Sequence, residues 1–451
     1  MATINEQIFR EYDIRGIVGT DLTEETVIPI ATAIGTYFRQ HGAKTVALGR
    51  DARASSPDFR DLFIKGLNSV GCNVLDVGMV PTPVLYFAVF TKPVDAGVMI
   101  TGSHNPADYN GFKLLLGRDS LHGEEIQNVK QIVLGGKFEE GSGSVEQYDI
   151  TTEYMDYVAQ NVSMGARRLK VVVDSGNGIG GIVGVPLYKK LGFDVIDIFT
   201  EPDARFPNHH PDPTVLKNLQ DAIAKVKETG ADLAICFDGD ADRIGVVDEK
   251  GGVLWGDELM VILSRAILKT QPGATFIADV KCSQRLFDDI EQKGGHAVMW
   301  KAGHSLIKAK MKETHAALAG EMSGHVFYQD RWFGFDDAIY TGARLLEILT
   351  NDEKQVSEYL SDLPHTVSTP ELRTEVAEEK KFEIVKKLTE EFKKTNKVID
   401  IDGARILFDK GWGLVRASNT QPVLVSRFEA LDDASLKQIQ DTVEAKVREL
   451  S

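Results

Sequence analysis

Cysteine is scarce in this sequence, which has only Cys72, Cys236 and Cys282 in 451 residues. Small extracellular proteins usually depend on paired cysteines, so three widely separated ones favour a reducing compartment. The first residues of the chain have neither the basic start nor the apolar core of a signal peptide. A cytoplasmic location is therefore expected.

Two further features are missing: a long apolar run and an excess of positive charge. Without a run long enough to span a bilayer, no membrane insertion is expected. The 67 acidic residues outnumber the 51 basic ones and give a formal net charge of −16. Because duplex binding needs a net basic face, nucleic acid is not an expected partner. A small anionic ligand would need local clusters of Arg, Lys and backbone N–H groups.

The sequence does contain the composition of a folded protein, with 43% hydrophobic and 26% charged residues. Its length exceeds what one hydrophobic core usually supports and predicts three or four domains. From about residue 27 to about residue 350, short Val- and Ile-rich runs alternate with amphipathic helical stretches. This alternation predicts parallel strands joined by crossover helices.

The α/β pattern has an internal repeat. Predicted strands at 45–51, 170–176 and 276–281 each run into a polar turn and then a helix, and later strands at 96–100, 233–237 and 297–300 each precede a polar loop. This spacing predicts one α/β architecture used three times, with functional loops at the carboxyl ends of strands. Chance similarity among strand–turn–helix units is the alternative.

The pattern changes after residue 364, where a helical stretch over 378–394, strands around Ile406 and Val423 and a final helix are expected. The fold class is therefore α/β, with three similar mixed-sheet α/β domains and a smaller C-terminal α+β domain. The expected domains are 1–150, 151–252, 253–364 and 365–451.

The segment 238–243 follows one predicted strand and precedes another, and it carries Asp238, Asp240 and Asp242. Carboxylates at i, i+2 and i+4 of an extended chain share one side, so three hard oxygen ligands converge, which suits Mg²⁺. An EF-hand calcium loop begins with the same spacing and would place Glu249 at its twelfth position. However, Arg243 stands where that loop needs Gly, and the flanks are strands. An acidic surface turn is the remaining alternative.

The segment 101–106 also follows a predicted strand. Gly102 lets the backbone approach a ligand, and the Asn-Pro pair that follows forces a turn that presents Ser103 as a nucleophile. His104 could bind phosphate or assist proton transfer, although adjacent side chains seldom point the same way. A serine that merely caps the turn is the alternative. The pair Asn110-Gly111 predicts a hairpin turn that leads Lys113 onto the next strand.

Two later segments carry groups that bind anions or hydroxyls. Residues 416–422 lie between two strand-like runs and offer a guanidinium, hydroxyls, an amide and free N–H groups, which suits a phosphate that stays in place. A polar hairpin loop is the alternative. Residues 320–325 add a carboxylate, a hydroxyl and an imidazole between glycines, which suits sugar hydroxyls.

In this order and at these separations, the four segments resemble the α-D-phosphohexomutase family, specifically its bacterial phosphomannomutase/phosphoglucomutase branch. The resemblance covers essentially the whole chain and includes residues 11–16, 205–211 and 303–305. It implies a four-domain, heart-shaped enzyme in which each domain contributes one loop to a central cleft. In chain order, the first loop would carry the phosphoserine, and the other three would bind the metal, the sugar and the non-reacting phosphate.

The resemblance also implies roles for individual residues. Ser103 would be the phosphoserine and would complete a magnesium site with the three aspartates. Sugar hydroxyls would be bound by Glu321 and Ser323, and the non-reacting phosphate by Arg416, Ser418, Asn419 and Thr420. Eight further residues match positions that line the cleft: Tyr12, Arg15, His104, Lys113, Arg243, Lys281, His304 and His325. Among these, Lys113, His104 and Arg15 are candidate proton acceptors. Ala241 replaces a Gly common in relatives, and its methyl group should leave the carboxylates in place.

The implied reaction interconverts hexose 1-phosphate and hexose 6-phosphate, with mannose or glucose as the sugar. It passes through phosphoserine and a hexose 1,6-bisphosphate, which is both intermediate and activator. A phosphoglucosamine mutase is the nearest alternative, but its sugar loop usually has Gln where this chain has Met322. A metal-dependent phosphatase and a non-enzymatic sugar-phosphate- or calcium-binding protein are alternatives of other classes. The expected partner is a small phosphosugar, and a monomer and a dimer are both compatible with the sequence.

Overall fold

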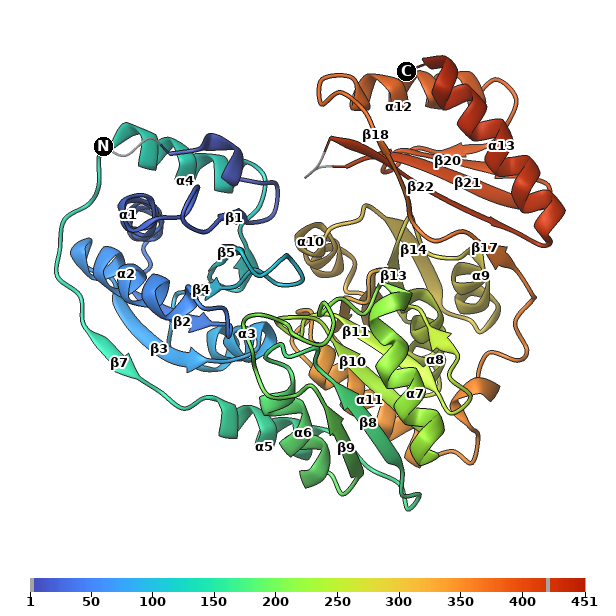
Figure 1. The fold of residues 1–451 in the computed structure, drawn as a ribbon, viewed down its shortest axis with the longest axis horizontal. Helices are drawn as coiled ribbons and strands as arrows, with labels where there is room; N and C mark the ends of the chain where they lie inside the picture. Colours follow the sequence, from blue (N-terminus) through green and yellow to red (C-terminus); the bar gives the residue numbers. More distant parts are fainter. Residues whose placement is uncertain (1–3, 419–421, 451) are drawn as a thin grey trace.

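The computed structural model describes residues 4–418 and 422–450, and it contains four β-sheets that follow one another along the chain (Figure 1). Each sheet with its helices is called a unit below. In Figure 1 the units form an arc, from the blue first unit at the left through green and yellow to the red fourth unit at the upper right. The arc is open between the first and fourth units. Within the described ranges, no helix is long and apolar enough to cross a membrane.

The first unit has the strand order β1-β5-β4-β2-β3-β7, with β6 paired to β5. Alternate residues of β2 face opposite sides: Val46 and Leu48 pack with α1 and α2, and Ala47 packs on the side of α3. A strand covered on both faces reads as a continuous apolar run, which is why the sequence pattern identified it. The elements are β1 (Ile14–Ile17), α1 (Glu24–Gln40), β2 (Thr45–Arg50), α2 (Ser56–Ser69), β3 (Asn73–Met79), α3 (Thr82–Thr91), β4 (Ala96–Ile100), β5 (Tyr109–Leu116), β6 (Asp119–Ser120), α4 (Glu124–Gly135) and β7 (Val145–Gln147).

The second unit has the strand order β12-β11-β10-β8-β9, and the third has β14-β13-β15-β16. The second unit contains α5 (Thr151–Asn161), β8 (Lys170–Asp174), α6 (Gly181–Lys190), β9 (Asp194–Ile198), α7 (Gln220–Thr229), β10 (Leu233–Phe237), β11 (Ile244–Asp248) and β12 (Val253–Leu254). The third contains α8 (Gly256–Leu268), β13 (Thr275–Asp279), α9 (Gln284–Gln292), β14 (His296–Trp300), α10 (His304–Thr314), β15 (Leu318–Gly320), β16 (Val326–Tyr328) and α11 (Ala338–Thr350).

The three units share one topology, which confirms the predicted repeat. The orders β3-β2-β4-β5, β9-β8-β10-β11 and β14-β13-β15-β16 match, and in each the first three strands are parallel and the last is antiparallel. The prediction that the strand near 297–300 is the third unit's counterpart of β4 and β10 is wrong. That counterpart is β15, a strand of three residues, which is too short to leave a pattern in the sequence.

The fourth unit is the expected smaller α+β unit, with an antiparallel sheet ordered β17-β22-β21-β20-β19 and β18 paired to β22. Helices α12 and α13 pack on it through Leu388, Phe428 and Val443. Its elements are β17 (Val367–Ser368), β18 (Leu372–Glu375), α12 (Lys381–Phe392), β19 (Val398–Ile399), β20 (Ala404–Phe408), β21 (Gly411–Ala417), β22 (Val423–Ala430) and α13 (Asp433–Leu450).

The first three units share one apolar core. Helix α11 of the third unit lies against the second unit: Gly342 leaves room for the ring of Tyr188, whose hydroxyl donates to Ile339 O at 2.9 Å. An aromatic cluster that includes Phe87, Tyr154 and Trp332 joins the first unit to the other two. Each such buried aromatic side chain contributes about 2–3 kcal/mol, so the relative positions of β4 and β10 are firmly set.

The predicted hairpin turn at Asn110-Gly111 is wrong, because both residues lie inside β5. The glycine serves a close approach: a Cβ at Gly111 would lie 2.4 Å from Ile14 O of the neighbouring β1. The Asn110 amide donates to Ser55 and Ser56 at 2.8 and 3.0 Å. The connection from β4 to β5 is instead the segment that carries Ser103.

Candidate active site

Ser103 follows the carboxyl end of β4 and lies buried, with a positive φ of 49°. Its N–H donates to Thr101 Oγ1 at 2.8 Å, which shapes the turn. Its Oγ lies 3.1 Å from His104 Nδ1, so these adjacent side chains do meet, contrary to the expectation.

Asp238, Asp240 and Asp242 follow the carboxyl end of β10, and all three are buried. One oxygen of each lies within 4.8 Å of the others. The loop is a turn rather than the expected extended segment, since Ala241 has φ 59° and Asp238 Oδ1 accepts the N–H groups of Asp242 and Arg243 at 3.1 Å. The flanking elements are the strands β10 and β11, which excludes the helix–loop–helix of an EF-hand.

These aspartates fit a hard divalent cation. Asp240 Oδ1 is buried and has no hydrogen-bond partner among residues 4–418 and 422–450. An unpaired buried carboxylate oxygen is costly, and a cation would compensate for it. Asp240 Oδ2 accepts from Thr82 Oγ1 at 2.6 Å and from Lys113 Nζ at 2.8 Å. The set combines three carboxylates with neighbouring Ser103 Oγ, all oxygen donors.

Lys113, on β5, is the counter-charge of this acidic loop and also contacts Asp242. Burial lowers the pKa of Lys113, but Asp240 and Asp242 outweigh it, so the pKa stands well above its usual range. Burial and the two other carboxylates raise the pKa of Asp238 well above its usual range. Burial opposes ionisation of Asp242 as well, yet Lys113 and His325 hold its pKa well below the usual range.

The loop after β15 carries Glu321, Ser323 and His325, the predicted sugar-binding group. Glu321 Oε2 lies 2.9 Å and Ser323 Oγ 3.2 Å from His325 Nδ1, while Arg243 Nε lies 3.3 Å from His325 Nε2. Burial lowers the pKa of His325, but chiefly Asp242 raises it, to about 9. Burial likewise opposes the ionised form of Glu321, but the hydrogen bond and charge of His325 lower its pKa to about 2.

Tyr12, Arg15 and His304 extend the site between the first and third units. The Tyr12 hydroxyl donates to Ala302 O at 3.2 Å, and the Tyr12 ring lies edge-on to His304 at 5.8 Å between centroids. Arg15, on β1, contacts Asn105 of the Ser103 loop.

Burial, with Arg243 and Arg15 close by, holds the pKa of His104 well below its usual range. Burial, Lys308 and Lys113 do the same for the pKa of His304. Both shifts favour the neutral imidazole, which has one ring nitrogen that can accept a hydrogen bond.

Lys281 follows β13, and its Nζ lies 3.6 Å from Asp279 and 3.5 Å from Glu371. Burial lowers the pKa of Lys281, but these two carboxylates give it a net increase. Glu371 precedes β18, so the contact links the third unit to the fourth.

Arg416 and Ser418 stand at the end of β21, in the hairpin with β22 that the sequence predicted. The Arg416 guanidinium contacts Asp402 Oδ2 at 3.0 Å, and the same oxygen accepts the N–H of Ala302 at 3.1 Å. The Ser418 N–H donates to Val423 O at 3.0 Å. Asn419 and Thr420 lie outside the described residues. Asp402 therefore links Arg416 to Ala302, the residue whose carbonyl oxygen accepts from Tyr12.

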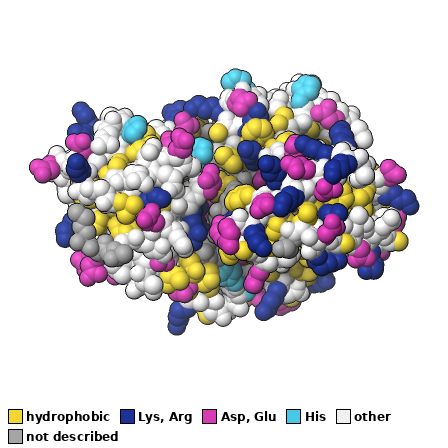
Figure 2. Space-filling view, turned by 90° about the horizontal axis from the view of Figure 1, so that it is seen from above, with side chains coloured by type: hydrophobic (Ala, Val, Ile, Leu, Met, Phe, Trp, Pro, Cys, Tyr) yellow, Lys and Arg dark blue, Asp and Glu magenta, His cyan; other side chains and the backbone are white. Residues whose placement is uncertain are grey.

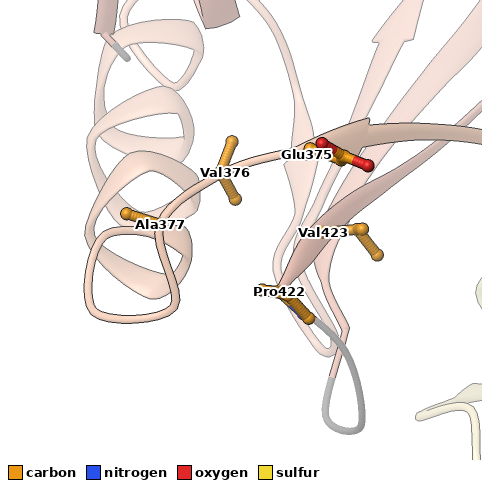
Figure 3. A pocket seen from close by; sticks show the side chains of 5 residues that line it. All are labelled: Glu375, Val376, Ala377, Pro422 and Val423. Atoms are coloured by element: carbon orange, nitrogen blue, oxygen red, sulfur yellow. The ribbon is translucent and has the colours of Figure 1, made fainter.

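The surface of the protein is hollowed on the face seen in Figure 2. Figure 2, seen from above, shows the surface hollowed between the two sides of the arc, with acidic and basic side chains interspersed on this face. A separate surface pocket of about 610 Å³ lies in the fourth unit (Figure 3). Four of its five lining side chains are apolar and the fifth is Glu375; Pro422, the last residue of the predicted phosphate-binding segment 416–422, is one of them.

Several residues of the site were not predicted. Thr82 and Asp402 contact predicted residues but stand in segments with no motif of their own. Arg53 donates to Ser103 O at 2.8 Å. The run of charged and hydroxyl residues over 50–56, directly after a predicted strand, is the only sequence signal that could have drawn attention to Arg53.

Comparison with known proteins agrees with this arrangement. Models of phosphoglucomutase/phosphomannomutase domains match in order: alpha/beta/alpha domains I, II and III at residues 6–140, 152–252 and 255–367, and the C-terminal domain at 371–446. The phosphomannomutase/phosphoglucomutase of Pseudomonas syringae is 48% identical, covering 99% of this chain and 96% of the relative. The phosphoglucomutase of Neisseria gonorrhoeae is 46% identical, covering 99% and 98%.

A solved structure of a phosphoglucomutase/phosphomannomutase family protein from Burkholderia thailandensis superposes with a TM-score of 0.94 at 44% identity, covering 99% of this chain and 98% of that one. Four matching domains and near-complete coverage leave no large segment of the chain unexplained. The chain therefore belongs to the phosphoglucomutase/phosphomannomutase family of hexose phosphate mutases.

Proposed function

We propose that this protein interconverts hexose 1-phosphates and hexose 6-phosphates of glucose, mannose or both, with Ser103 as the residue that carries the phosphoryl group. The observation that carries the proposal is the contact of Ser103 Oγ with Asp238 Oδ2, 3.0 Å apart and buried. A hydroxyl beside a metal-binding set of carboxylates is suited to phosphoryl transfer, which depends mainly on positioning and charge neutralisation.

In the proposed reaction the P–Oγ bond of phosphoserine breaks as a new bond forms from phosphorus to O6 or O1 of the sugar phosphate. The resulting hexose 1,6-bisphosphate turns end for end and returns its other phosphate to Ser103. Lys113, Arg15 and Arg243 are the cations beside the moving group, and they stabilise its charge. The attacking sugar hydroxyl loses its proton, and Ser103 Oγ gains one as it leaves phosphorus. Of the candidates Lys113, His104 and Arg15, the two cations already carry their protons. The imidazole of His104, 3.1 Å from Ser103 Oγ, is therefore the group that can pass a proton at this position.

The metal of this proposal is Mg²⁺, held by Asp238, Asp240, Asp242 and the phosphate on Ser103. When bound, it neutralises charge on the phosphoryl oxygens. Hard oxygen donors without nitrogen or sulfur favour Mg²⁺ over zinc or copper. The hexose 1,6-bisphosphate also serves as activator, because it phosphorylates Ser103 when the enzyme has lost its phosphate.

The remaining residues are assigned to the substrate. Glu321 and Ser323 bind sugar hydroxyls, and the non-reacting phosphate is held by Arg416 with Ser418, Asn419 and Thr420. Tyr12, Lys281, His304 and His325 line the path between the two ends. A cradle that accepts either end of the sugar matches a bisphosphate that must reverse its orientation.

The proposal includes the domain boundaries 1–150, 151–252, 253–364 and 365–451, and a cytoplasmic location. The strand β12 at Val253–Leu254 pairs with β11, so the proposed boundary after residue 252 leaves this last short strand of the second sheet on the side of the third domain. The chain acts on a small phosphosugar as a monomer or dimer.

Turnover with Mg²⁺ and a trace of hexose 1,6-bisphosphate tests the proposal, with glucose 1-phosphate, mannose 1-phosphate and glucosamine 1-phosphate measured in parallel. Conversion of the first two to 6-phosphates is expected. A preference for glucosamine 1-phosphate would assign the chain to phosphoglucosamine mutases despite Met322, and steady phosphate release would indicate a phosphatase. Intact mass should show one phosphate on the wild type and none on Ser103→Ala; equal masses would remove Ser103 from its role.

A further inference from the structure

Arg53 lies beneath the Ser103 loop, with 2% of its surface exposed. Its guanidinium donates to four backbone carbonyls of this loop: Ser103 O at 2.8 Å, Asn105 O at 2.6 Å, Tyr109 O at 2.8 Å, and Pro106 O. One side chain thus holds the loop at its start, middle and end.

The guanidinium is itself held in place. Its Nε lies 3.3 Å from Asp51 Oδ2, and the same oxygen accepts the N–H of Gly102 at 3.1 Å. Asp51 Oδ1 accepts from the Arg53 N–H at 2.9 Å and from Ser56 Oγ at 2.6 Å. A Cβ at Gly102 would lie 2.3 Å from Arg53 Cζ, so the residue before Ser103 has no side chain because the guanidinium fills that space.

Two residues of the second unit also contact Arg53 or the Ser103 loop. His210 Nε2 donates to His104 O, the one carbonyl between residues 103 and 106 that Arg53 does not reach, and the Phe206 ring lies 5.4 Å from Arg53 Cζ. The carbonyls of residues 103–106 therefore all have donors. Because a trans peptide places N–H opposite C=O, the N–H of His104 points away from Arg53.

Ser103 needs such support because its φ of 49° lies in the left-handed region, which residues other than glycine rarely adopt without external contacts. The Ser103 carbonyl bonded to Arg53 belongs to the same residue whose Oγ faces Asp238. The hydrogen bonds on the carbonyl side thus determine where Oγ lies on the other side.

We propose that Arg53 is a positioning residue for Ser103. By holding the loop carbonyls it fixes the phosphate on Oγ relative to Asp238, and so sets how fast phosphoserine donates to the sugar. This inference rests on the proposed role of Ser103. The polar contacts of the Arg53 guanidinium are with the loop carbonyls and Asp51, so the role we assign to Arg53 is indirect.

Only arginine meets this requirement. Its planar fork presents five donors in fixed directions, which suits four carbonyls and one carboxylate around a buried point. Lysine has three donors on one compact ammonium. Arg53→Lys therefore keeps the positive charge but loses the planar arrangement of donors that matches the loop carbonyls.

The test is single-turnover transfer from phosphoenzyme to glucose 1-phosphate, expressed per phosphorylated molecule, for the wild type, Arg53→Lys and a matched control, Arg60→Lys. Arg60 is a partly buried arginine of the same unit, and its guanidinium pairs with Asp76 and Asp61. A displacement of about 1 Å at a reacting group costs about 100-fold in rate. We expect a fall of this order for Arg53→Lys, with KM changed less than about threefold and Arg60→Lys close to the wild type.

A purely structural role would lower the amount of folded protein and leave the transfer rate per phosphorylated, folded molecule unchanged. That result, confirmed by thermal unfolding well above the assay temperature, would overturn the inference. If Arg53→Lys does not fold, Asp51→Asn loosens the guanidinium while retaining it, and a transfer rate equal to that of the wild type would again overturn it. Absence of phosphate on Ser103 of the wild type would instead refute the proposed function, so the two failures are distinguishable.

Discussion

Ser103 Oγ and Asp238 Oδ2 lie 3.0 Å apart although 135 residues separate them in the chain. Ser103 follows β4 and Asp238 follows β10, and these are equivalent strands of two units with the same topology. A Cβ at Gly239 would lie 2.3 Å from Ser103 O, so the two loops touch through their backbones as well. Two equivalent strand ends, brought together by the shared core, thus form the centre of the site.

The acidic loop should bind the metal on which activity depends. Asp240→Asn removes one of three converging carboxylates and leaves Lys113 with one partner fewer, so we expect at least a tenfold loss of Mg²⁺ affinity together with loss of turnover. Chelation should likewise abolish wild-type activity, and added Mg²⁺ should restore it. Calorimetric titration and turnover measure the two effects. Asp400→Asn, at an exposed carboxylate paired with Lys393, is the control; full activity of Asp240→Asn would contradict the metal assignment.

Gly239 and Ala241 lie two residues apart in the metal loop, but substituting each by the other residue type should affect kcat very differently. A methyl at Gly239 would lie 2.3 Å from Ser103 O, which is backbone and cannot move aside, so Gly239→Ala should separate the loops and lower kcat by about 100-fold. Ala241 has φ 59°, a conformation that glycine adopts without strain. Ala241→Gly should therefore change stability by less than about 1 kcal/mol and leave kcat nearly intact.

Steady-state kinetics and thermal unfolding of these two variants test the comparison. Wild-type kcat in Gly239→Ala would mean that the two loops do not touch during turnover.

Asp337, at the start of α11, should make stability depend on pH. Burial raises its pKa to about 7, despite hydrogen bonds from the Tyr340 N–H at 2.8 Å and the Tyr154 hydroxyl at 3.0 Å. Because the folded pKa exceeds the unfolded value of about 3.9, the stabilisation is complete below about pH 4 and is lost as the pH rises through 7.

Asp337→Asn cannot ionise, so the difference in unfolding free energy between it and the wild type should shift toward the variant by about 2 kcal/mol between pH 5 and pH 8. Urea unfolding at both pH values measures this shift. A difference that does not change with pH would show that Asp337 stays in one protonation state over this range.

The sequence predicted the parts of the fold that local patterns encode. The predicted strands at 96–100 and 233–237 coincide with β4 and β10, because runs of five buried residues followed by polar turns leave a clear signal. The prediction of a turn at Asn110-Gly111 was wrong. This pair usually favours a tight turn, but here its glycine lets the neighbouring strand β1 approach closely. The strand β15 was missed because three residues carry no periodicity.

The contacts that complete the site are of longer range. Arg53 lies 50 residues from Ser103, and Asp402 lies 100 residues from Ala302. No local pattern relates such pairs; only the packed arrangement of the units does. The contact of Ser103 Oγ with His104 Nδ1 is unexpected because adjacent side chains seldom point the same way, and the left-handed φ of Ser103 leaves no signal in the sequence either.

The position of α11 has a consequence for synthesis of the chain. Gly342 of this helix packs on Tyr188 and on Ile235 of β10, so a helix encoded about 100 residues after β10 covers the second unit. On the ribosome, the second sheet is complete well before α11 has emerged, so the apolar surface around Ile235 and Tyr188 that α11 covers has to wait for it. Growth of the nascent chain at about 5–20 residues per second makes that interval several seconds long. During it, apolar surface beside β10, the strand that positions the aspartates, stays exposed, and exposed apolar surface of this kind favours aggregation.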